Sequence, residues 1–483
     1  MRKRIELQYE LGTIRVEDVK IPKTRDELPP TLRALQYIYQ TPEANEQVFT
    51  ILNKKILTTH KGRPGMSLWE ILVLGIVRLT LDVNYDRLEH IANYDRLVRS
   101  ILGIENEYGF TARKTYSLQA IKDNVSLLDE DMLDEINNIV ISQGHKIKKK
   151  ENEKISAKVD SYVVESNVHF PTDLNLLKDG INKSIKLCTK LADILHLSGW
   201  RKQDMWLNRI KSQYRIVNKI KGGKNQDSRK KRAVLNYLDE VVKVLDKIDK
   251  SKQEFEQLDN VSTVEALIYK DLLYFEEMSY KHVNLIRRRL LLDEVIPHSE
   301  KVFSLFEVYT EWINKGKAGN KIELGIKLAI STDQFGFILN KRIMENEQDV
   351  DAAVPIFEAL KAHYDMESIS YDKGFWSKEN YESINGEIPQ VIMPKKGKQN
   401  KEEYEREHTK EFIKKRKAHS AIESNINSLE HHGLNRCPDK GLGHYKRYIA
   451  LGVLSYNLHK LGNILQEEEL KKAKRRNKKK LAA

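Results

Sequence analysis

Cysteine is almost absent from this chain of 483 residues, which has only Cys188 and Cys437. Two cysteines exclude a disulfide framework and a cysteine-rich zinc site, and they favour a reducing compartment such as the cytoplasm. Long apolar runs are missing too. The longest, LWEILVLGIVRLTL, is interrupted by Glu70 and Arg78, and the amino-terminal MRKRIELQYELG lacks the apolar core of a signal peptide. The sequence therefore predicts a globular protein with no membrane span.

Positive charge is what the chain has in excess. Lys and Arg number 83 against 70 Asp and Glu, and the sequence pI is about 9.2. A polyanion is therefore a more natural partner than an acidic protein, although a merely basic, soluble protein would have the same balance. The length predicts about three domains.

The first 150 residues have a helical pattern and are expected to form a DNA-binding domain. Ser67 and Glu70 have the spacing of a capping box. The pentapeptide NYDRL occurs at 84–88 and again at 93–97, as in two short helices of a helix-turn-helix. That motif would direct three arginines toward phosphates, but amphipathic packing helices would give the same pattern: Arg87, Arg96 and Arg99.

Two further features close this domain. A helix is predicted from about 128 to 143, ending at Gly144. The run HKIKKKENEK, residues 145–154, is predicted to be an exposed basic linker.

The rest of the chain alternates strands and helices around a long helical segment. ISAKVDSYVV (155–164) has strand periodicity, as does the hairpin that begins at Ile322, while about 173–314 is dense in Leu, Lys and Glu at helical spacing. A helix at about 350–363, a strand ending before Asp372, the strand QVIMP and a long helix at about 401–430 follow. With the helical segment removed, this is the order of a ribonuclease-H-like mixed sheet, in which Asp160 and Asp372 come close together.

We therefore expect an α/β catalytic core of the ribonuclease-H-like kind with a large all-helical insertion, preceded by an all-α domain. The expected parts are residues 1–150, the helical domain; 151–172 and 315–465, the catalytic domain; 173–314, the insertion; and 466–483, a basic tail without fixed structure.

Three carboxylates form the candidate site. Asp160 and Asp372 would repel each other unless a divalent cation lay between them, and Glu423 lies at the edge of an apolar stripe made by Ala418, Ile422, Ile426 and Leu429. An all-oxygen set suits two Mg²⁺ or Mn²⁺ ions and in-line attack on a phosphodiester. For any one of these aspartates, a cap of a helix or turn is the commoner role.

Several blocks resemble one family. They are VDSYVVESNVHFPTDLNLL, TEWINKGKAGNKIELG, SYDKGFWSKENY, VIMPKKGK and HSAIESNINSLEHHGLNRC. They are similar to bacterial insertion-sequence transposases of the DDE class, in the subgroup called ISNCY. The resemblance implies a metal-dependent enzyme with the triad Asp160, Asp372 and Glu423. It departs from the family two turns beyond Glu423, where Glu430, His431 and His432 replace the usual basic residue.

Other acids and histidines compete for these roles. Asp333, at the predicted hairpin tip, is the chief rival of Asp372, but aspartate is favoured there for turn formation alone. Asp173, Asp349 and Asp351 are interpreted as helix caps or first-turn acids. Four histidines have no zinc-site spacing and are interpreted as solvated: His169, His419, His431 and His432.

Basic loops flank the proposed cleft, where Trp376 is placed to stack on a base. The candidate DNA contacts there are Lys315, Lys317, Trp376, Lys395, Lys396, Lys415 and Arg416. Each alone is more often ordinary charged surface, or a core anchor in the case of Trp376. The tail KKAKRRNKKK would add salt-sensitive affinity for DNA or only aid solubility.

The resemblance implies cleavage of DNA at the terminal inverted repeats of an insertion sequence and joining of the freed 3′-hydroxyls to target DNA. It implies a homodimer on DNA and a bacterial cytoplasmic, nucleoid-associated location. Two alternatives stay open: a ribonuclease-H-like nuclease without strand transfer, and a catalytically idle, transposase-derived DNA-binding protein.

Overall fold

The structure is a computed structural model that describes residues 26–56, 65–104, 114–196, 199–258, 261–314 and 322–481. By its internal contacts the chain divides into two compact units. The first comprises residues 1–167 with 313–483, and the second comprises residues 168–312. The second unit thus falls close to the predicted insertion, whereas the predicted boundary near residue 150 lies inside the first unit and stays a prediction.

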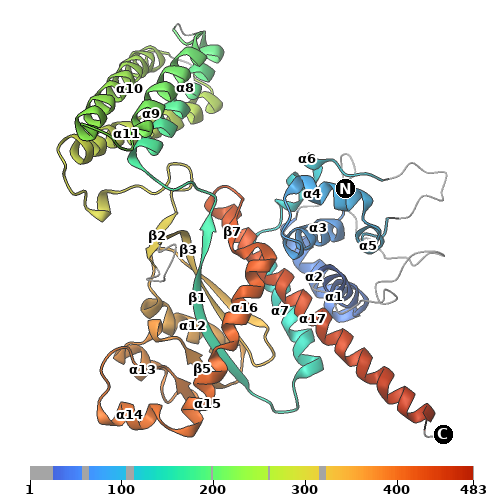
Figure 1. Ribbon diagram of the computed structural model, residues 1–483. Helices are drawn as coiled ribbons and strands as arrows, with labels where there is room; N and C mark the ends of the chain where they lie inside the picture. The colour runs from blue at the N-terminus through green and yellow to red at the C-terminus, as the bar shows by residue number, and fades with distance from the viewer. Residues whose placement is uncertain are drawn as a thin grey trace. The chain divides into compact units, whose positions relative to one another are not determined.

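The amino-terminal part of the first unit is helical, as expected (Figure 1). In α3 the predicted capping box is present, because Ser67 Oγ accepts from Glu70 N–H and Glu70 accepts from Ser67 N–H. The whole of α3 is buried. The helices are α1 Leu28–Gln40, α2 Pro42–Lys55, α3 Leu68–Thr80, α4 Tyr85–Tyr94, α5 Arg96–Ile101, α6 Leu118–Val125 and α7 Glu130–Lys148.

The predicted end of α7 at Gly144 is wrong. The helix continues to Lys148, so the segment 145–154 is a linker only after its first four residues. Gly144 serves packing instead, since a Cβ there would lie 2.2 Å from the Phe337 ring. Glycine is needed for this close approach. Glycine destabilises a helix by about 1 kcal/mol relative to alanine, and the long buried helix forms in spite of it.

In the described part of the chain, seven strands form one mixed sheet, which confirms the predicted ribonuclease-H-like fold class. The order is β2-β3-β1-β5-β6, with β4 paired to β3 and β7 paired to β1. The central strand β1 is antiparallel to β3 and parallel to β5. The strands are β1 Ile155–Ser166, β2 Glu311–Asn314, β3 Ile322–Thr332, β4 Ile338–Met344, β5 Met366–Tyr371, β6 Gln390–Ile392 and β7 Arg436–Cys437.

Helices follow the strands in the predicted order, but the single long helix expected at 401–430 is three helices. Thr409 caps the second of them by accepting from Phe412 N–H, and a further break falls at Ser420. Ala418 therefore belongs to α15 and is exposed, whereas Ile422 and Leu429 of α16 are buried. The helices are α12 Asp349–His363, α13 Lys378–Ile384, α14 Lys401–Glu407, α15 Lys410–His419 and α16 Ala421–Leu429.

The last helix, α17, spans Leu442–Leu481. Its first half is buried in the first unit, with side chains such as Tyr445, Leu454 and Leu461 fully covered. The tail expected to lack structure is instead the continuation of this helix. Lysine and arginine are good helix formers, so a basic run that follows a packed helix can extend it. No helix in the described ranges is long and apolar enough to cross a membrane.

The second unit is a helical bundle with its own core (Figure 1). Its helices are α8 Asp173–Leu195, α9 Gln203–Lys219, α10 Gln226–Glu256 and α11 Thr263–Ile286. Buried side chains from all four meet, among them Leu177, Ile210, Leu245 and Leu272. The helical pattern does not continue to residue 314 as predicted, because an irregular segment follows the π-helical turn Arg287–Leu291 and leads into β2.

Candidate active site

The two aspartates of the candidate triad stand on neighbouring strands. Val159 of β1 is paired with Tyr371 of β5 in parallel register, so Asp160 is the next residue of β1 and Asp372 is the residue directly after β5. Asp372 is exposed and begins a 3-10 turn, with Gly374 N–H 3.5 Å from its Oδ2. Asp372 can therefore cap this turn and also bind a ligand, because such a long contact is a weak hydrogen bond and leaves the carboxylate oxygens available.

Glu423 joins this edge of the sheet from α16, which packs against β1 (Figure 1). It lies in the first turn and is exposed, whereas Ile422 beside it is fully buried. The buried neighbour fixes the helix on the sheet, and the exposed carboxylate is directed to the solvent side of that contact.

The acidic side chains of the candidate site are close enough to influence one another's ionisation. The pKa of Asp160 is raised to about 6, first by burial and then by the negative charges of Asp372, Asp349 and Glu423, against a hydrogen bond from Ser161 N–H that favours the ionised form. Like charges gathered at one place disfavour ionisation unless a cation compensates them. The structure thus brings all three candidate residues into one electrostatic neighbourhood.

The donor set has the chemistry of a site for a hard divalent cation, since it offers carboxylate oxygens alone. As the side chains stand, however, no group of three or more His, Cys, Asp or Glu residues in the described part of the chain is arranged to hold a metal ion. The acids share one region without forming a closed coordination shell.

Asp349 is a neighbour of the site that the sequence interpretation missed. It is a first-turn acid of α12, as expected, but its Oδ1 also accepts from Ser161 Oγ at 2.7 Å and its Oδ2 lies 3.3 Å from Lys327 Nζ. A Cβ at Gly374 would lie 2.9 Å from the same Oδ2. The available signal was position: α12 is the crossover helix between β4 and β5, so its start can reach the edge where β5 ends.

His419 also borders the site, which corrects its interpretation as a solvated residue. Its Nδ1 lies 2.8 Å from Ser370 Oγ, and its Nε2 is buried without a hydrogen-bond partner in the described structure. Burial lowers the pKa of His419, and the charges of Asp372 and Glu423 oppose that shift. The imidazole therefore lies within electrostatic range of two triad acids.

The other histidines are dispersed. His432 is fully buried against His459 and was wrongly interpreted as solvated, whereas His431 is exposed. His169 pairs with Asp179 at 2.9 Å.

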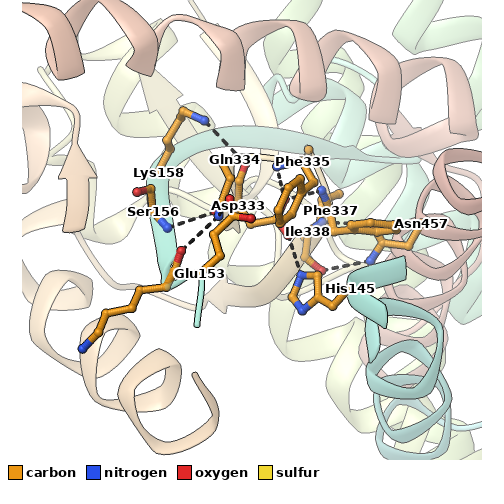
Figure 2. A network of polar contacts seen from close by, with 12 residues as sticks. His145, Glu153, Ser156, Lys158, Asp333, Gln334, Phe335, Phe337, Ile338 and Asn457 are labelled. Carbon is orange, nitrogen blue, oxygen red and sulfur yellow. Dashed lines mark hydrogen bonds and ion pairs between the residues drawn. The ribbon is translucent and has the colours of Figure 1, made fainter. Parts of the chain in front are cut away.

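Asp333, the rival aspartate, is committed to structure (Figure 2). It is 1% exposed, and its Oδ1 accepts from the N–H groups of Phe335 and Phe337 at 2.8 and 2.9 Å. Its Oδ2 lies 2.7 Å from His145 Nε2 of α7. Both oxygens are thus occupied in closing the β3–β4 turn and joining it to α7, which supports the preference for Asp372.

The predicted DNA contacts differ in their availability. Arg87 and Arg96 are exposed, but Arg99 is 3% exposed and its Nη1 donates to the carbonyls of Ala92, Asn93 and Lys114. A buried guanidinium bound to carbonyls supports packing, so Arg99 is withdrawn as a phosphate contact.

In the catalytic part, Lys396 and Arg416 are exposed. Lys395 is bound to Glu403 at 2.6 Å, and its Nζ lies 5.2 Å from the centre of the half-buried Trp376 ring. Lys415 is half-buried, with Glu367 3.9 Å away. Lys315 and Lys317 lie outside the described residues.

Comparison with known proteins gave one finding. No curated protein and no solved structure matches the chain. Residues 293–458, which include Asp372 and Glu423 but not Asp160, match the family model described as Transposase DDE domain, and this match supports a transposase with a DDE domain.

Proposed function

We propose that the protein is an insertion-sequence transposase that cuts DNA at the element ends and transfers the freed 3′-hydroxyls to target DNA. The observation that carries the proposal is the parallel register of β1 and β5, in which Val159 pairs with Tyr371 directly before Asp160 and Asp372. Burial and the charges of Asp372, Asp349 and Glu423 raise the pKa of Asp160, and the family match covers Asp372 and Glu423. Carboxylates that disfavour one another's charge are a common signature of functional sites.

In this proposal two divalent ions, Mg²⁺ or Mn²⁺, are held by Asp160, Asp372 and Glu423. When bound, such ions supply the positive charge that favours in-line displacement at a phosphodiester. The chain itself fixes two of the three carboxylates through the paired strands β1 and β5 and the third through α16. Asp349 holds Ser161 beside Asp160 and so limits how that strand residue can move.

DNA is the proposed substrate, and a homodimer is the proposed form on DNA because two element ends are handled together. Four exposed cations are proposed as phosphate contacts: Arg87 and Arg96 in the amino-terminal helices, and Lys396 and Arg416 in the part of the chain after β6. Their contribution would be independent of DNA sequence and weakened by salt.

The decisive experiment is cleavage and joining of a labelled DNA that carries the inverted repeats flanking the coding sequence, in the presence of Mg²⁺. Asp372→Asn keeps the size of the side chain and removes its charge, so both reactions should fall by about 10²- to 10³-fold, a typical loss when a charge-stabilising group is removed. Binding to the same DNA should persist.

Asp365→Asn is the matched control. Asp365 immediately precedes β5, as Asp372 follows it, and its exposed pair with Lys154 contributes little. Full activity in both variants would refute the triad. Cleavage without joining would favour a nuclease, and DNA binding without chemistry in the unaltered protein would favour an idle site.

A further inference from the structure

The second unit contains a cavity that the proposed chemistry does not use. Its volume is about 260 Å³, and its walls come from the start of α8 and the chain before it, the π-helical turn after α11, the irregular segment that follows and β2. Small-ligand pockets begin at about 300 Å³, so this space suits one planar ring system more than a large ligand.

Three aromatic rings line the cavity in series. The ring centres of Phe170 and Trp312 are 5.4 Å apart, and those of Trp312 and Phe303 are 5.5 Å apart. Phe170 is 57% exposed although it belongs to this cluster. The Phe170 ring therefore lines the cavity and can also be reached from solvent.

Cations stand at the same cavity. Arg289 and Lys301 line it together with one carboxylate, Asp173, which lies 3.1 Å from Arg289 Nη1. The Arg289 side chain is 54% exposed, whereas Asp173 is 15% exposed, so the guanidinium can still be reached by a second anion while it is paired with Asp173. In the described structure no carboxylate lies within ion-pair distance of Lys301 Nζ. The cavity thus combines stacking faces with an excess of positive charge.

We infer that this cavity binds an unpaired nucleotide of DNA, with the base against Phe170 and Trp312 and its phosphate near Lys301 and Arg289. Aromatic faces accept any base, and cations track the backbone, which is the pattern of single-strand binding surfaces. An acidic peptide would use the cations but not the rings. The inference rests on the proposed function only in taking DNA as the ligand.

The test uses the full-length protein and a labelled duplex with one bulged 2-aminopurine, beside the same duplex with an abasic bulge. Chelator is present, so no metal-dependent cleavage enters the measurement. Unaltered protein should bind the base-containing bulge about 5- to 150-fold more tightly, the factor that one base stacked on an aromatic side chain provides. Binding should also quench the 2-aminopurine fluorescence.

Phe170→Ala should abolish this preference, and Phe306→Ala should retain it. Phe306 is a fair control because it is 53% exposed in the same unit but does not line the cavity. Lys301→Gln should weaken binding to both duplexes and reduce the salt slope by about one unit. Thermal melts establish that each variant is folded.

Equal affinity of the unaltered protein for the two bulges would overturn the inference, as would a preference that survives Phe170→Ala or is lost equally in Phe306→Ala. The cleavage assay is separate. A protein that prefers the unpaired base but cuts no DNA would retain this inference while the proposed function fails.

Discussion

Asp333 and Asp372 both follow a strand, yet their carboxylates do different work. Asp333 is enclosed, accepts from two backbone N–H groups and contacts His145 (Figure 2). Asp372 is exposed, with one long contact to Gly374 N–H. A buried, fully used acceptor stabilises the fold, and an exposed acceptor with spare lone pairs is available to bind something else.

Asp333→Ala should therefore lower the free energy of unfolding by about 2 to 4 kcal/mol, because two buried N–H groups and an imidazole lose their acceptor. Asp372→Ala should change it by less than about 0.5 kcal/mol. Urea denaturation followed by far-UV circular dichroism gives both values. A similar loss in the two variants would mean that Asp372 also has a structural role.

The role of a single residue could be predicted from the sequence where its residue type and its place in the element order point to the same function. Asp160 and Asp372 were placed side by side because a carboxylate in one strand and another after the parallel strand must meet once the element order is known. Arg99 and Asp349 could not be assigned in this way. Whether an arginine is buried under carbonyls, or a first-turn acid reaches a neighbouring strand, depends on tertiary contacts between elements distant in the chain.

Among the elements, strands were predictable and helix boundaries less so. Period-2 alternation in the sequence predicted β1 and the β3–β4 hairpin. In the structure the alternation of burial is clear only in the first half of β1, and the second half of β3 is buried throughout. Gly144 and residues 401–430 misled the prediction. A glycine usually marks a helix end, but here it allows the close approach of Phe337. The cap at Thr409 and the break at Ser420 divide a segment that helix propensity alone would join.

The contact between α17 and the turn after α16 makes the fold sensitive to acid. Burial lowers the pKa of His432 to about 3 and that of His459 to about 4, from 6.5, and the two rings face each other with Nε2 and Nδ1 3.2 Å apart. Below pH 6.5 the unfolded chain takes up protons at these positions and the folded chain does not. Stability should therefore fall as the pH drops from 6.5 toward 4.

The expected loss is about 1.4 kcal/mol per histidine for each pH unit below 6.5. His459→Gln should lose less stability than the unaltered protein between pH 7 and 5.5, whereas His431→Gln, at an exposed position, should follow the unaltered protein. Denaturation midpoints at the two pH values measure this. Identical pH dependence in all three proteins would show that these rings do not control acid stability.

At the scale of the whole molecule, the sheet-bearing unit and the helical unit have separate cores. The change from strand periodicity to Leu, Lys and Glu at helical spacing predicted this division, but the end of the bundle was misplaced because the segment after α11 has apolar residues without regular structure. Residues 168–312 exceed the size below which a single domain becomes marginal. We therefore expect two unfolding transitions instead of one.

Core truncations should assign the transitions. Leu245 and Leu328 are fully buried, the first in the helical unit and the second in β3 of the sheet. Replacing either with alanine removes similar apolar contacts at a cost of about 2 to 5 kcal/mol. In differential scanning calorimetry, Leu245→Ala should lower only one transition and Leu328→Ala only the other. If each variant moved both transitions together, the two units would unfold as one cooperative body.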